Sequence, residues 1–177
     1  MKKFTLLIII GLFFLSCDSE DISNSKKLIT ESIDINADSK PDFKLEYYEL
    51  STTDIPSSAG AKIGKIIPID ENLILYNENN GYLFLEKGDI ITKNGTDNKN
   101  WFRFEADVIS KKRTYEVWDK IWTVESNLTE NYYLGIKLKS GSSEKIGWIK
   151  LEFDTANGKV YILDSEISSL DELTIKD

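Results

Sequence analysis

The sequence contains no histidine and a single cysteine, Cys17. Ser-His-Asp and Cys-His catalysis and histidine-ligated zinc sites therefore lack the residues they need, and no disulfide can form within one chain. Arginine is also scarce, with two copies against twenty lysines, so bidentate arginine clamps on carboxylate or phosphate groups are not a general feature of the chain. Any chemistry must use carboxylates, lysines, tyrosines, hydroxyls or a hard cation held by oxygen.

Positive charge is in the minority, because 22 basic residues face 30 acidic ones and give a formal net charge of −8. Without Lys2 and Lys3, which belong to the leader described next, 20 basic residues remain and the net charge becomes −10. A surface of this sign repels phosphates, which argues against a nucleic-acid partner. It is compatible with cation binding.

One long apolar run is present, at residues 4–15, and it follows a short positive segment at residues 1–3. Its 12 residues suit a secretion signal and fall short of the roughly 20 that a membrane-spanning helix needs. The run ends in Phe-Leu-Ser-Cys at residues 14–17, which resembles the bacterial lipobox. We therefore expect a lipoprotein signal peptide at residues 1–16 and a lipid anchor on Cys17. An ordinary signal peptide with an incidental cysteine is the alternative.

Residues 17–27 are polar and almost free of apolar side chains, which predicts a flexible tether. The acidic residues directly after Cys17 resemble the surface-export signal of Bacteroidetes lipoproteins. That resemblance implies an outer-membrane lipoprotein whose domain is exposed at the cell surface. The periplasmic face of the outer membrane is the alternative.

Residues 28–177 have the pattern of a single all-β domain. Short segments of alternating residues recur between turn sequences, as at Phe43, Leu45 and Tyr47, and none has the period of a helix. The Asn-Gly sequence within residues 154–158 predicts a hairpin turn. Roughly eight to ten antiparallel strands are expected, arranged as a β-sandwich or jelly roll.

Short motifs across these residues resemble a pattern common in small secreted β-proteins of Bacteroidetes. Residues 133–138, followed by Gly-Trp-Ile-Lys-Leu at residues 147–151, are similar to the C-terminal part of that pattern, which ends in a final hairpin strand. Residues 85–91 are similar to its Gly-Asp loop, and residues 34–43 to an early Asp-rich loop. The resemblance implies an exported β-sandwich and implies no activity, because these proteins have none assigned.

The Asp-rich segment at residues 34–42 is a candidate calcium site. Oxygen-bearing side chains at alternate positions can converge on one hard cation, and the seventh position offers its backbone carbonyl. The segment resembles calcium loops of the Asp-x-Asn-x-Asp-Gly type, but Ser39 replaces the glycine and Leu45 the final glutamate. We expect a structural role for any bound ion, and a plain turn with solvated carboxylates is the alternative. The predicted ligands are Asp34, Asn36, Asp38, Lys40 through its carbonyl, and Asp42.

Strand alternation predicts an aromatic patch on one sheet. If Phe102, Phe104 and Val108 face the core, Trp101 points outward, and the same reasoning turns Tyr133 and Trp148 outward. We expect these three rings to form a surface on which a sugar or peptide stacks. Coverage by loops or by the partner sheet is the alternative.

Trp118 and Trp122 fall in a segment, residues 114–124, that predicts one long strand. They share the same side of that strand, so we interpret both as core anchors.

The remaining general route to catalysis is a pair of carboxylates, as in glycoside hydrolysis. A chain with 30 acidic residues brings several such pairs together by chance, so their positions alone favour no reaction. The candidates by position on strands are Glu105, Asp107, Glu116, Asp119 and Glu152.

Thr155 is a candidate modification site, because residues 154–156 read Asp-Thr-Ala and resemble Bacteroidetes O-glycosylation sites.

These observations favour a lipoprotein without catalytic residues that binds a carbohydrate or another envelope component. A carboxylate-pair glycoside hydrolase and a purely structural or accessory envelope lipoprotein are the two alternatives.

Overall fold

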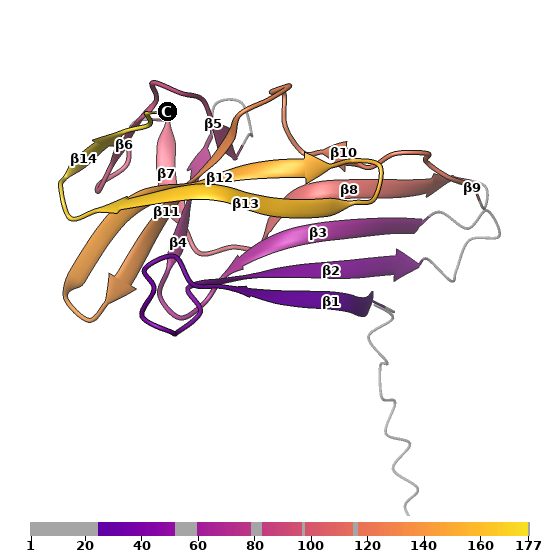
Figure 1. The fold of residues 1–177 in the computed structure, drawn as a ribbon, viewed down its shortest axis with the longest axis horizontal. Coiled ribbons are helices and arrows are strands. Elements are labelled where there is room, and N and C mark those ends of the chain that lie inside the picture. The colour runs from indigo at the N-terminus through magenta and orange to yellow at the C-terminus, as the bar shows by residue number, and fades with distance from the viewer. Residues whose placement is uncertain (1–24, 52–59, 79–82, 97, 115–116, 177) are drawn as a thin grey trace, which may run out of the picture.

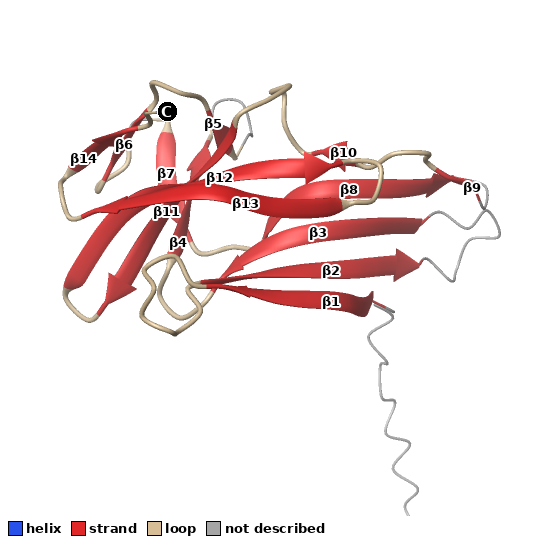
Figure 2. Cartoon of the chain, viewed as in Figure 1, coloured by secondary structure: helices blue, strands red, loops and turns tan. Residues whose placement is uncertain are grey.

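The computed structural model describes residues 25–51, 60–78, 83–96, 98–114 and 117–176. These ranges contain fourteen β-strands and no helix, which confirms the all-β class (Figures 1 and 2). The strands outnumber the expected eight to ten because several have only two or three residues. They are β1 (Ser25–Ile33), β2 (Phe43–Ser51), β3 (Gly60–Pro68), β4 (Leu73–Asn77), β5 (Phe84–Leu85), β6 (Ile90–Thr92), β7 (Lys99–Phe102), β8 (Ala106–Thr114), β9 (Val117–Trp118), β10 (Thr123–Val124), β11 (Tyr132–Ser140), β12 (Ser143–Asp154), β13 (Lys159–Ser168) and β14 (Glu172–Thr174).

The strands form two six-stranded sheets and one two-stranded sheet, all antiparallel. Sheet A has the order β1-β2-β3-β8-β10, with β9 beside β8. Sheet B has the order β13-β12-β11-β4-β7, with β5 beside β11, and the small third sheet pairs β14 with β6. Sheets A and B pack as the two layers of a β-sandwich, with β1 and β13 at their edges (Figure 1).

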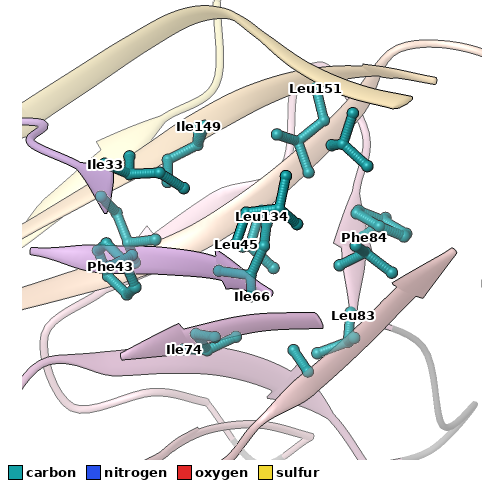
Figure 3. Packing of buried hydrophobic residues seen from close by; sticks show 14 of the residues in the cluster. Ile33, Phe43, Leu45, Ile66, Ile74, Leu83, Phe84, Leu134, Ile149 and Leu151 are labelled. Carbon is teal, nitrogen blue, oxygen red and sulfur yellow. The ribbon is translucent and has the colours of Figure 1, made fainter. Parts of the chain in front are cut away.

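The main core lies between sheets A and B (Figure 3). Sheet A contributes alternate side chains such as Phe43, Leu45 and Ile66, and sheet B contributes Leu134 and Ile149; all five are buried. Burial of each such side chain contributes about 1.5–3 kcal/mol, so this interface supplies most of the apolar stabilisation of the sandwich.

A second apolar cluster lies on the opposite face of sheet B. Tyr133 and Trp148 form its centre, with their ring centroids 5.3 Å apart and their planes at 85°. The small sheet covers them, because Ile91 of β6 and Leu173 of β14 belong to the same cluster. The middle strands of sheet B are therefore buried on both faces.

Two long strands expected from the sequence are each interrupted. The segment 101–108 contains the end of β7 in sheet B and the start of β8 in sheet A, because the chain crosses between the sheets at residues 103–105. This crossing leaves Phe102 40% exposed, whereas Val108 is buried as expected. The segment 114–124 likewise divides into β9 and β10, and both of these strands pair with β8.

The hairpin predicted at residues 154–158 joins β12 to β13. Its loop has four residues, 155–158, and Gly158 adopts a φ of +70° while its N–H donates to the Asp154 carbonyl at 2.7 Å. The Asp154 carboxylate accepts the N–H groups of Ala156 and Asn157, both at 3.1 Å. Hydrogen bonds from the side chain and the backbone of Asn157 hold the pKa of Asp154 below its usual value. The turn is therefore fixed by local hydrogen bonds.

Candidate functional site

Asp42, a predicted calcium ligand, is a buried hydrogen-bond acceptor at the start of β2. One carboxylate oxygen accepts the N–H of Ile35 at 2.8 Å and that of Asn36 at 3.3 Å, and the other accepts the Asn36 amide at 3.2 Å. Burial raises the pKa of Asp42, and the two backbone N–H groups oppose that rise. Its contacts therefore close the loop that connects β1 to β2.

The other predicted ligand side chains form tight turns within the same loop. Asp34 accepts the N–H of Ser39 at 2.8 Å, and Asn36 and Asp38 accept the N–H groups two residues further on, both at 2.9 Å. Ser39 adopts a φ of 68°, at the position where glycine is usual in calcium loops. No group of three acidic residues that could hold a metal occurs within the described ranges. Calcium at this loop stays a prediction.

A cavity of about 430 Å³ lies between this loop, the β3–β4 turn and the β11–β12 hairpin. Three acidic and three basic side chains line it, and none of the described lining residues is aromatic. It therefore offers neither a net charge nor a stacking surface to select a ligand. The charged lining residues are Asp38, Lys40, Asp42, Asp70, Lys139 and Lys145.

Trp101, Tyr133 and Trp148 lie on one face of sheet B, as alternation predicted, but they do not form an exposed patch. Tyr133 is 1% exposed and Trp148 is 4% exposed beneath the small sheet. Trp101 packs against the same cluster, and its indole N–H donates to the Thr92 carbonyl at 2.9 Å. The expectation of an exposed stacking surface is wrong here because β6 and β14 cover the rings.

Two of the candidate carboxylates share one position on sheet A, and the others lie apart from them. Glu105 and Asp107 both lie beside Lys65, at 3.0 Å and 3.7 Å from its ammonium nitrogen. Burial raises the pKa of Asp107, and Lys65 lowers it. Asp119 accepts the backbone N–H of Lys112 at 3.3 Å.

Two further candidates complete that set. Glu152 is exposed on β12 opposite Tyr161, and Glu116 lies outside the described residues. None of the described candidates lines the aromatic cleft considered next.

Sheet A extends beyond the β12–β13 hairpin (Figure 1). An aromatic cleft of about 350 Å³ lies between the hairpin and this part of sheet A. We call it the end cleft. Sheet A supplies one wall, the hairpin supplies the other, and Trp122 stands between them. The residues that line it are Glu31, Tyr47, Lys62, Trp122, Asn157, Gly158, Lys159, Val160 and Tyr161.

Trp122 is held in the end cleft from three sides. Its backbone N–H donates to the Thr155 carbonyl at 2.8 Å. Its ring meets Tyr47 edge to face, with centroids 6.3 Å apart at 85°. On the third side it lies against Gly158, where a Cβ atom would come within 2.1 Å of the indole. The indole is therefore fixed in place while remaining partly exposed.

Tyr47 and Tyr161 border the same opening. Burial raises the pKa of Tyr47 to about 12, a backbone hydrogen bond from Val160 opposes the rise, and the nearby Glu31 and Tyr161 add to it. Tyr47 itself is 7% exposed and belongs to the core, whereas Tyr161 is 44% exposed. The end cleft thus has a rigid aromatic floor and an accessible aromatic rim.

The sequence analysis placed Tyr47 in an alternating strand and interpreted Trp122 as a core anchor, and it did not identify the end cleft. Both residues do contact the main core. The cleft arises because Trp122 meets a hairpin more than thirty residues further along the chain, at Gly158, and no local pattern encodes that contact. Thr155 lies in the same hairpin, partly exposed, and its glycosylation stays a prediction.

No helix long and apolar enough to cross a membrane occurs in the described part of the chain. No protein-family model, curated protein or solved structure matches this sequence or its fold.

Proposed function

We propose that this chain is an outer-membrane lipoprotein, exposed at the cell surface, that binds a carbohydrate or another envelope component in the end cleft. The lipobox-like sequence at residues 14–17 supports the anchor, and Cys17 itself lies outside the described residues. The acidic residues that follow Cys17 support surface exposure through their resemblance to the export signal of Bacteroidetes lipoproteins.

The fixed position of Trp122 carries the binding proposal. A partly exposed indole bordered by polar side chains is a surface on which sugar rings stack, and a pre-positioned ring loses little conformational entropy on binding. Tyr161 at the rim and Lys62 and Asn157 in the walls supply a second ring and hydrogen-bonding groups. The carboxylates singled out as catalytic candidates lie elsewhere, so the geometry favours binding over hydrolysis.

Tyr161→Ala in the full-length, detergent-solubilised protein tests the cleft. Phe102→Ala is the matched control, because Phe102 is an aromatic residue of similar exposure on another strand. Binding is measured against an array of neutral and acidic polysaccharides and peptidoglycan. We expect Tyr161→Ala to weaken binding about tenfold, the loss of one stacking contact, and Phe102→Ala to leave it unchanged. Binding to nothing on the array, or equal binding by both variants, would contradict the proposal.

Cys17→Ser tests the anchor. Several acyl chains, each contributing about 0.8 kcal/mol per buried methylene, hold a protein firmly on a bilayer. We expect the wild-type protein in the membrane fraction and the serine variant outside it, as measured by fractionation of expressing cells. A serine variant that remained with the membranes would refute lipidation.

A further inference from the structure

We propose that the end cleft selects sugar chains bearing anionic groups, carboxylate or sulfate, through a row of cationic side chains on sheet A. This inference rests on the proposed function and specifies its ligand. The row comprises Lys62 of β3 and Lys111 and Arg113 of β8.

The row lies on the face of sheet A that also forms the core. A Cβ on Gly64 would contact Ile109 at 2.8 Å and Tyr47 at 3.0 Å, so position 64 faces inward. Lys62 is two residues away on the same strand, without an intervening register shift, and therefore faces the same way. Its side chain emerges at the end cleft, which it lines.

The strands of sheet A place like charges beside one another. Lys62 and Lys111 are directly opposite each other across β3 and β8. Arg113 lies two residues beyond Lys111, and a Cβ on Gly60, which also faces inward, would come within 3.2 Å of the Arg113 Nε atom. Like charges directly opposite each other destabilise a sheet. Lys111 donates to the Lys120 carbonyl at 3.4 Å and Lys62 lies 3.7 Å from Glu49, and a bound anion would further reduce the repulsion between the two ammonium groups.

The ring of Trp118 makes cation–π contacts with two residues of the cationic row, Lys62 and Arg113. The Lys62 Nζ atom lies 4.9 Å from the ring centroid and the Arg113 Cζ atom 5.3 Å from it. The Arg113 Nε atom is buried without a hydrogen-bond partner among the described residues. One of only two arginines in the chain is thus positioned by an aromatic ring.

The local charge is opposite in sign to that of the whole chain. Among the described residues that line the end cleft, Lys62 and Lys159 are cationic and Glu31 is acidic. Lys111 and Arg113 extend the positive charge along sheet A from Lys62, and Glu49 pairs with Lys62. Glu49 lies 3.7 Å from Lys62, and both side chains are about one-third exposed. A net positive cleft on a chain of net charge −8 favours an anionic ligand, because the remaining surface repels such ligands elsewhere.

The test compares matched acidic and neutral sugars on the full-length, detergent-solubilised protein. Oligogalacturonate and its methyl ester form the carboxylate pair, and dextran sulfate and dextran form the sulfate pair. The variants are Lys62→Gln, Lys111→Gln and the control Lys112→Gln, whose exposed side chain lies on the other face of β8. Affinity is measured by calorimetry at low and high salt.

We expect one acidic sugar to bind at least tenfold more tightly than its neutral partner, and the pair that shows this difference identifies carboxylate or sulfate. Lys62→Gln and Lys111→Gln each weaken that binding about tenfold, the loss of one charge-assisted contact, whereas Lys112→Gln does not. Equal affinity for acidic and neutral sugars, lost only in Tyr161→Ala, would overturn the inference and leave the proposed function standing. Binding weakened equally by all three lysine variants would also overturn it, since that result indicates nonspecific attraction. No binding to any of the four sugars would overturn the inference. If the protein also bound nothing on the wider polysaccharide array, the proposed function would be contradicted as well.

Discussion

At the residue scale, the end cleft depends on a glycine, Gly158, which has no side chain. Gly158 is required twice, because its φ is +70° and because Trp122 occupies the space that a Cβ would take. The sequence indicated the first requirement through its Asn-Gly turn. The second requirement involves a contact distant in sequence, and only the folded structure reveals it.

Gly158→Ala is therefore expected to cost more than an ordinary glycine substitution in a turn. Gly141 is the control, since it has a φ of +59° and a Cβ there would meet nothing within 4 Å. We expect about 1 kcal/mol of destabilisation for Gly141→Ala, from the backbone alone. Gly158→Ala adds an overpacking cost and totals about 2–4 kcal/mol. Urea unfolding measures both, and equal losses would show that Trp122 moves aside freely.

Lys137 gives a pH-dependent contribution to stability. Its side chain is 7% exposed, and its ammonium group donates to the Lys93 carbonyl and lies 5.0 Å from the Trp101 ring centroid, with Glu144 at 3.6 Å. Burial lowers the pKa of Lys137 from 10.5, and Glu144 opposes the shift. The folded state therefore binds fewer protons than the unfolded state in the window below 10.5, and stability rises with pH there.

Lys137→Met removes that contribution. The pKa of Glu144, which Lys137 lowers, lies in the acid range, so at neutral and alkaline pH the difference in unfolding free energy isolates Lys137. We expect the wild type to gain stability relative to the variant as the pH rises from neutral toward 10.5, measured by urea unfolding. A constant difference across this range would show that the burial of the ammonium group has no energetic consequence.

At the element scale, alternation predicted which side chains share a face but not what covers that face. The inward positions of Phe43, Leu45 and Val108 followed directly from the period of two. Trp148 was placed on the correct face, yet the three-residue strands β6 and β14 that bury it carry too short a pattern to be recognised in sequence. The crossing between sheets at residues 103–105 was missed for a different reason. The apolar and polar residues continue to alternate through the crossing, so the sequence pattern does not reveal that the chain changes sheets.

The burial of Trp148 predicts a structural role that mutation can separate from binding. Trp148→Ala is expected to cost about 3–5 kcal/mol, the range for removing a large buried ring. Trp148→Phe keeps most of the packing and should retain wild-type affinity for any sugar that the end cleft binds. Thermal unfolding and the glycan array provide the two measurements. Weaker sugar binding by a stable Trp148→Phe protein would indicate that the ligand binds at sheet B and not in the end cleft.

At the scale of the whole molecule, the start of β1 and the end cleft lie at the same end of sheet A (Figure 1). Ser25 begins β1 in the same cross-strand row as Leu50, Ala61 and Lys112. Adjacent strands are about 4.8 Å apart, so three spacings separate Ser25 from the strand that carries Lys111 and Arg113 by about 15 Å. The cationic row therefore lies close to the point where the chain leads toward Cys17.

This arrangement limits how far the end cleft can stand from a bilayer. Eight residue steps join Cys17 to Ser25, and at full extension they span at most about 28 Å. A long sugar chain that approaches from solution must enter this narrow space, whereas a chain attached to the envelope already occupies it. A lipidated protein should therefore bind long free polysaccharides less readily than short ones.

Insertion of a twelve-residue Gly-Ser segment before Ser25 tests this geometry. On vesicles carrying the lipidated protein, we expect the longer tether to increase binding of long acidic polysaccharides and to leave binding of short oligosaccharides unchanged. In detergent the two proteins should bind both ligands alike, because no extended bilayer then restricts the cleft. If the insertion has no effect on vesicles, the end cleft opens away from the membrane. The position of Ser25 then does not determine how far the end cleft lies from the bilayer.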